Sequence, residues 1–63
     1  MSKNLLDVDE AAAHLSVTPR FIRRLVAQRR VPYLKVGRFI RFDVSDLDAW
    51  LDACRVESVN YGG

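Results

Sequence analysis

The chain has 63 residues, of which 49% are hydrophobic, and its formal net charge at pH 7 is +2. A chain of this length forms one small domain, close to the lower size limit for folding without disulfides or a metal. The single cysteine, Cys54, excludes an internal disulfide, and together with the single histidine, His14, it is too few for a structural zinc site. We therefore expect a small apolar core, no metal or other cofactor, and no catalytic residues, because so short a chain has little room for a deep pocket.

No segment is typical of a targeting signal or a membrane span. The N-terminus, Met-Ser-Lys-Asn-Leu-Leu-Asp, holds no apolar run long enough for a signal peptide. No stretch approaches the ~20 apolar residues that cross a bilayer. We expect a soluble cytoplasmic protein without a membrane partner, organised as a flexible leader (residues 1–6), one domain (residues 7–54) and a flexible tail (residues 55–63).

The first expected element is a short helix over about Val8–Leu15. Asp7 or Asp9 can cap it, and negative charge in its first turn suits the helix dipole. Its apolar residues recur at i, i+3, i+4 and i+7 and form one narrow stripe: Val8, Ala11, Ala12 and Leu15.

A second helix is expected to begin at Thr18-Pro19 and to run to about Gln28 or Arg29. Thr is a good N-cap, and Pro at the first helical position costs nothing because that N–H is unpaired in any helix. One face is apolar (Phe21, Ile22, Leu25 and Val26) and the other is mostly basic (Arg20, Arg23, Arg24, Ala27 and Arg30). Two helices joined by a tight turn, with a basic outer face, are typical of a helix-turn-helix.

A β-hairpin is expected next. Tyr33–Val36 and Phe39–Phe42 are β-rich runs separated by Gly37-Arg38, and Gly at the first central position suits a type II′ turn.

The last expected element is a helix over about Val44–Cys54, capped by Asp43 or Ser45. Its inward face is expected to hold Leu47, Trp50, Leu51 and Cys54. The elements together predict a mostly α fold with a small β-hairpin, the winged helix-turn-helix.

Charge is strongly segregated along the chain. The range Thr18–Phe42, which we call the basic segment, holds no acidic residue and eight of the ten basic residues: Arg20, Arg23, Arg24, Arg29, Arg30, Lys35, Arg38 and Arg41. Residues 1–17 carry −2 and residues 43–63 carry −4, so the net charge hides a polarised molecule. A field of one sign concentrates a partner of the opposite charge, and nucleic acid is the commonest such partner.

The second helix is the predicted recognition helix, because the DNA major groove admits one helix and its N-terminal residues meet base edges. Its candidate DNA-binding residues are Thr18, Pro19, Arg20, Arg23, Arg24, Gln28 and Arg30. We expect Arg20 and Arg24 to read bases and Arg23 to reach a base or a phosphate. Gln28 and Arg30, near the far end, are expected to reach the backbone.

The hairpin is the predicted wing. A cation at its tip can enter the adjacent minor groove, where narrow A·T-rich stretches have an enhanced negative potential. We expect Gly37 and Arg38 at this tip, with Lys35 and Arg41 against phosphates on either side. If six of the cations contact phosphates, a plot of log affinity against log salt concentration would have a slope of roughly −5.

Several residues also have simpler interpretations. A basic helix face alone is usually only solvated, and the coincidence with a capped helix and a basic hairpin is what favours DNA binding. Arg29 would fall on the apolar face of the second helix, so it is expected to mark the helix end. His14 is expected to be a surface residue without a metal or catalytic partner. Trp50, Cys54 and the phenylalanines are expected in the core, not stacked on bases.

A family resemblance rests on four runs of the sequence: Leu6–Pro19, Val31–Arg38, Arg41-Phe42 and Asp46–Leu51. In order and spacing these runs resemble the excisionase-type, MerR-like winged-helix DNA-binding family over about residues 5–54. That family includes phage and mobile-element excisionases (recombination directionality factors) and AlpA-like transcriptional regulators. Relatives often have Gly where this chain has Arg29, in a left-handed conformation that costs a non-Gly residue roughly 1 kcal/mol. Either a phosphate contact would account for Arg29, or the helix ends differently in this chain.

The resemblance implies a DNA-bending accessory protein of a bacterial host cell, associated with the nucleoid when bound and without a small-molecule effector. Its implied partners are double-stranded DNA, an integrase that it steers towards excision, and further copies bound cooperatively on repeated sites. An AlpA-like regulator that uses the same surface on a promoter is the alternative. A third hypothesis, from another class, is a protein-interaction module whose basic segment docks an acidic partner.

Overall fold

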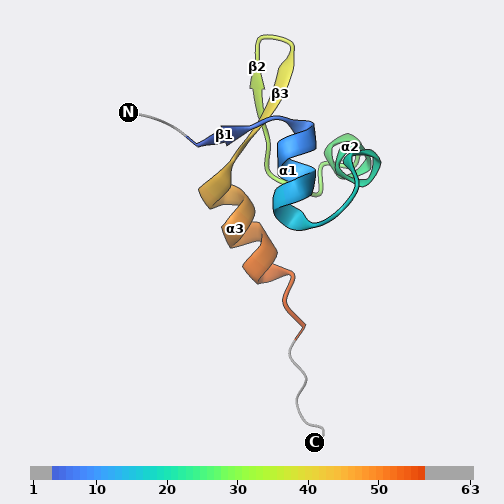
Figure 1. The fold of residues 1–63 in the computed structure, drawn as a ribbon, viewed down its shortest axis with the longest axis vertical. Helices are drawn as coiled ribbons and strands as arrows, with labels where there is room; N and C mark the ends of the chain where they lie inside the picture. The colour runs from blue at the N-terminus through green and yellow to red at the C-terminus, as the bar shows by residue number, and fades with distance from the viewer. Residues whose placement is uncertain (1–3, 57–63) are drawn as a thin grey trace, which may run out of the picture.

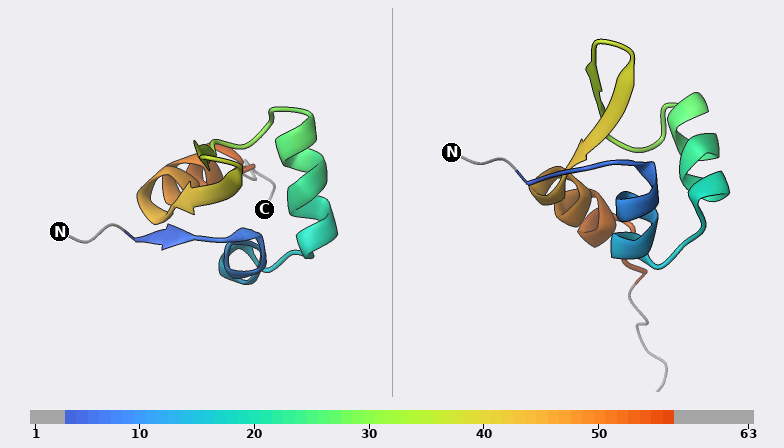
Figure 2. Two further views of the ribbon diagram at one scale, coloured as in Figure 1. Left: turned by 90° about the horizontal axis from the view of Figure 1, so that it is seen from above. Right: turned by 45° about the horizontal axis from the view of Figure 1, so that its top comes forward.

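The computed structural model describes residues 4–56, which form three helices and three strands. In chain order these are β1 (Leu5–Leu6), α1 (Val8–Leu15), α2 (Pro19–Ala27), β2 (Leu34–Val36), β3 (Phe39–Asp43) and α3 (Val44–Ala53). The strands form an antiparallel sheet in the order β1-β3-β2. The β2–β3 hairpin projects beyond the helices, which gather at its base (Figures 1 and 2). This is the predicted winged helix-turn-helix, mostly α with a small hairpin.

Helix α1 begins at a reciprocal capping box. The Asp7 carboxylate accepts a hydrogen bond from the Glu10 backbone N–H at 2.8 Å, and the Glu10 carboxylate accepts from the Asp7 N–H at 3.0 Å. Of the two predicted caps, Asp7 is therefore the one used. Both bonds satisfy N–H groups that the helix itself leaves unpaired.

Helix α2 follows the predicted cap at Thr18 and ends slightly earlier than the sequence predicts. The Thr18 Oγ1 accepts from the Phe21 N–H at 3.1 Å, and Pro19 occupies the first helical position. The helix ends at Ala27, with Gln28 as its C-cap. Arg29, which was expected to mark the helix end, lies two residues after Ala27, so the helix is one or two residues shorter than predicted.

Helices α1 and α2 end in the same way, each at a non-glycine residue in the left-handed region. Ser16 has φ 61° and Arg29 has φ 56°. The N–H of the next residue then donates to the carbonyl five residues back, at 2.9 Å after α1 and 2.8 Å after α2. These are Schellman motifs, a role that glycine usually fills because it has no Cβ.

The hairpin has the predicted two-residue turn, since Val36 pairs with Phe39 across Gly37-Arg38. Gly37 has φ +64°, whereas Arg38 does not have a positive φ. A positive φ at the first central position alone is the pattern of a type II′ turn.

Strand β1 differs from the expectation for the N-terminus. The sequence predicted a flexible leader over residues 1–6, but Leu5 and Leu6 pair with Asp43 and Phe42 of β3. Two residues show no alternation that could reveal a strand, and this one forms because β3 offers a free edge. Residues 1–3, like residues 57–63 of the predicted tail, lie outside the described residues.

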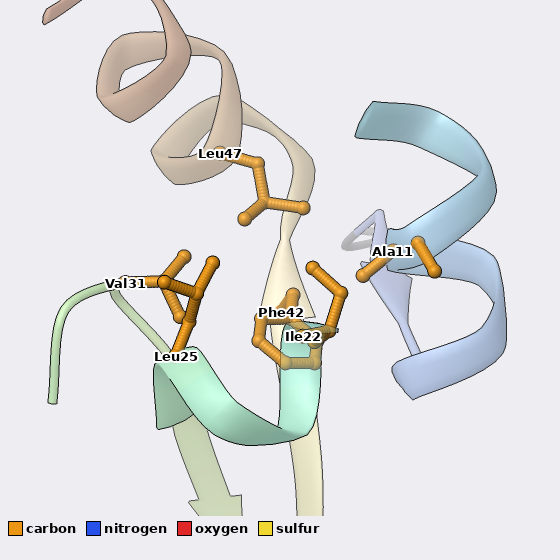
Figure 3. Close-up of a cluster of buried hydrophobic side chains, with 7 residues drawn as sticks. Ala11, Ile22, Leu25, Val31, Phe42 and Leu47 are labelled. Carbon is orange, nitrogen blue, oxygen red and sulfur yellow. The ribbon is translucent and has the colours of Figure 1, made fainter. Parts of the chain in front are cut away.

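The core lies where α1, α2, α3 and β3 meet (Figure 3). Its buried members are Ala11, Ala12, Ile22, Leu25, Val31, Phe42 and Leu47. Phe42, Ile22 and Leu47 are the largest side chains that are fully buried. The two alanines of α1 are almost fully buried, as suits a helix packed closely against α2.

Four residues that the sequence placed inside are exposed in the structure. Phe21 is 41%, Leu51 46% and Phe39 54% exposed, and Cys54 is also exposed. Their exposure has a geometric reason. Ile22 and Leu25 set the buried face of α2, and α3 runs away from the other elements beyond its first turns (Figure 1).

Two polar contacts tie α3 to the helix-turn-helix. His14 Nε2 lies 2.8 Å from Asp48 Oδ1, and Trp50 Nε1 donates to the Arg30 carbonyl at 2.7 Å. His14 is exposed as expected, but the sequence did not reveal its carboxylate partner on α3.

Candidate nucleic-acid interface

Helix α2 presents three arginines to solvent. Arg20, Arg23 and Arg24 are exposed, whereas Ile22 and Leu25 on the opposite side are buried. Because the buried pair packs into the core, the rotation of α2 about its axis is fixed. The core therefore determines which side chains a docked duplex would meet.

Two hollows border α2, and Arg23 and Arg24 line different ones. A hollow of about 180 Å³ adjoins the base of the hairpin and is lined by Val8, Arg23, Val26 and Ile40. A larger one, of about 520 Å³, lies towards α3 and is lined by Phe21, Arg24, Leu25, Gln28, Arg30, Trp50 and Cys54. Within the predicted strip of arginines, Arg23 therefore lies on the side of α2 that faces the wing, and Arg24 lies on the side that faces α3. Helix geometry places Arg20 between these two arginines around the axis of α2.

The end of α2 brings Gln28 and Arg30 beside Arg24. The Gln28 N–H donates to the Arg24 carbonyl at 3.0 Å, and all three residues line the larger hollow. Arg29 and Arg30 are exposed, and the Trp50 indole holds the Arg30 carbonyl. The residues expected to reach the DNA backbone are therefore gathered at this end of the helix.

The wing carries its cations at the tip and along both strands. Lys35 and Arg38 are exposed, while Arg41 is half-buried. Arg41 donates from its guanidinium to the Ile40 carbonyl at 2.7 Å. A Cβ added at Gly37 would meet no atom within 4 Å, so the positive φ of Gly37 is what favours glycine there.

A feature of the wing that the sequence analysis missed is an apolar outer face. The ring of Phe39 lies under two guanidiniums, with Arg38 Cζ at 5.8 Å and Arg41 Cζ at 5.3 Å from its centroid. Leu34 and Val36 are exposed on the neighbouring strand. The signal was present in the sequence, because apolar residues stand at both alternating positions of a hairpin that has only one face on the core.

The carboxylates and most of the cations of the described residues lie on different elements: the cations are on α2, the turn after it and the hairpin, and the carboxylates are on α1, α3 and at the N-caps of these two helices, Asp7 and Asp43. The contact between His14 and Asp48 and the ion pair between Arg55 and Asp52 both lie outside the basic segment. Helix α3 exposes Asp46, Asp48 and Asp52, and it runs away from the hairpin (Figure 1). The field of the basic segment is thus directed at whatever approaches α2 and the wing.

An exposed basic helix beside a basic wing defines a DNA-binding protein of the winged helix-turn-helix class. The chain belongs to the helix-turn-helix domain family, whose model matches residues 5–55. This membership supports sequence-specific binding to double-stranded DNA. No curated protein matches the chain. None of the helices within residues 4–56 is long and apolar enough to cross a membrane.

Proposed function

We propose that the protein is an excisionase that binds and bends attachment-site DNA and directs an integrase towards excision. The observation that carries this proposal is the adjacency of α2 and the wing, which meet at the hollow lined by Arg23 and Ile40. One molecule can then place α2 in the major groove and the wing in the next minor groove. Simultaneous engagement of both grooves favours a deformed duplex, and the contacts that bending permits offset its cost.

The residues that we propose to bind DNA are those predicted from the sequence, with the same contacts. Arg20 and Arg24 read bases, and Arg23, on the wing side of α2, reaches a base or a phosphate. Gln28 and Arg30 contact the backbone at the end of the helix. On the wing, Arg38 enters the minor groove, and Lys35 and Arg41 meet phosphates.

Further copies of the protein are proposed to bind beside the first on repeated sites. The exposed carboxylates of α3 are opposite in sign to the basic segment, so α3 of one copy can attract the basic segment of the next. The integrase is proposed as the second protein partner.

A circular-permutation gel assay on duplexes from the flanks of the gene's own integration site tests bending. We expect several protected sites in a footprint. We also expect the gel mobility of the protein–DNA complex to depend on the position of the binding site within the DNA fragment. Straight DNA with one isolated site would overturn the excisionase proposal. An excision reaction with the neighbouring integrase should require this protein.

The AlpA-like regulator is the alternative outcome of the same experiments. A promoter response without an effect on recombination would favour it. Failure to bind any duplex at moderate salt, with tight binding to an acidic protein, would favour the interaction module instead.

A further inference from the structure

The outer face of the wing is an apolar strip bordered by cations. In the register of the hairpin, Leu34 lies opposite Arg41 and Val36 lies opposite Phe39, so these four side chains share one face. Ile40 is on the other face and packs against the core. Leu34 is 40%, Val36 52% and Phe39 54% exposed.

This strip differs from a scattered exposure of single apolar residues. Its three members are adjacent, they lie on the part of the fold that projects furthest from the helices, and Arg38 and Arg41 both stack on Phe39 (Figure 1). Contiguous exposed apolar surface with a polar rim is typical of an interaction site.

The charges around the strip indicate its partner. Lys35, Arg38 and Arg41 all belong to the same hairpin, and the basic segment has no carboxylate. The same face of a second copy would bring like charges together. The minor groove of DNA instead offers apolar sugar walls between two rows of phosphates, and proteins place apolar wedges such as Phe there.

We propose that Phe39, with Val36 beside it, is seated in the minor groove of the bound duplex and supplies an apolar contact that adds to the contacts of the cations. This inference rests on the proposed DNA binding. It assigns Phe39 a role that the wing cations alone do not provide, because an apolar contact releases no counterions. Its contribution to affinity is therefore nearly independent of salt.

The test compares the Phe39→Ala variant with the wild-type chain in duplex titrations at several salt concentrations. We expect Phe39→Ala to bind about 10-fold more weakly, within the range for loss of an aromatic contact to nucleic acid. The loss should be similar at every salt concentration, whereas Arg38→Ala should lower the salt slope by about 1. Netropsin, which occupies the minor groove, should weaken wild-type binding more than it weakens Phe39→Ala binding.

Leu51→Ala is the matched control, because Leu51 is 46% exposed but lies on α3. Its affinity for the duplex should equal that of the wild type. Phe39→Leu, which keeps an apolar side chain, should fall between the wild type and Phe39→Ala, and it provides the test if Phe39→Ala does not fold.

Wild-type binding to the duplex with equal binding by Phe39→Ala would overturn this inference and leave the proposed function intact. A change confined to cooperativity, with altered self-association in sedimentation, would also overturn it and assign the strip to a second copy. Absence of duplex binding by the wild type would instead refute the proposed function.

Discussion

The indole of Trp50 donates a hydrogen bond from Nε1 to the backbone carbonyl of Arg30 at 2.7 Å. The bond joins α3 to the turn that directly follows α2. Leu47, one turn earlier on α3, is fully buried in the core. Helix α3 therefore supports the end of α2 on the side that faces the core. The position of Arg30 depends on Trp50, which lies twenty positions later in the chain.

Replacing Trp50 with Phe should destabilise the fold by about 1–2 kcal/mol, because the Arg30 carbonyl loses its partner and some buried area is lost. Urea unfolding followed by circular dichroism measures the loss of stability. Tryptophan fluorescence cannot be used for the variant, because Trp50 is the chain's single tryptophan. Arg30→Ala is the control. It keeps the carbonyl, so it should leave stability unchanged and weaken DNA binding. An unchanged unfolding midpoint for Trp50→Phe would contradict the supporting role of this bond.

Arg29→Gly should stabilise the fold by about 1 kcal/mol, because Arg29 has a positive φ of 56° that glycine adopts without strain. Ser16→Gly, at the equivalent position of α1, should stabilise it similarly. The two variants should differ on DNA. If Arg29 contacts a phosphate, only Arg29→Gly lowers the salt slope, by about 1. Thermal melts and duplex titrations measure the two effects, and a lower melting temperature for both variants would show that the left-handed positions are not strained.

Thr18→Ala should cost about 1 kcal/mol of stability, because it removes the acceptor for the Phe21 N–H at the start of α2. Thr18→Ser keeps a hydroxyl and should stay close to the wild type. Denaturant unfolding of the two variants provides the measurement. Equal losses for Ala and Ser would indicate that the methyl group of Thr18, not its hydroxyl, contributes the stability.

Arg20→Ala and Arg24→Ala should each cost about 1–3 kcal/mol of binding free energy and relax the sequence preference, because bidentate contacts to guanine specify the base. Lys35→Ala should weaken binding to all sequences alike and lower the salt slope by about 1. Selection of preferred sites from a random duplex pool, followed by titration, separates the two behaviours. Identical behaviour of all three variants would show that the division between base and phosphate contacts is wrong.

Local signals in the sequence were sufficient for most of the secondary structure. The bounds of α1 were predicted correctly, as were the Thr18 cap and the turn at Gly37-Arg38, and the end of α2 was predicted to within two residues. Each depends on residues only a few positions apart, through a capping hydrogen bond, a fixed φ or a period of side chains. The short strand β1 escaped prediction because its only cause is the free edge of β3, 36 positions away in the register that joins Leu6 to Phe42.

The sequence by itself determined the order of the elements and the segregation of charge, since propensities, caps and the positions of charged residues are local properties. Only the tertiary structure decided which apolar side chains are buried. Phe42 is enclosed, whereas Phe39, three residues earlier, is exposed on the wing. Burial depends on which elements cover a face, and a hairpin with apolar residues on both sides has only one side against the core. For the same reason, only the fold placed Arg23 beside the wing and Arg24 beside α3.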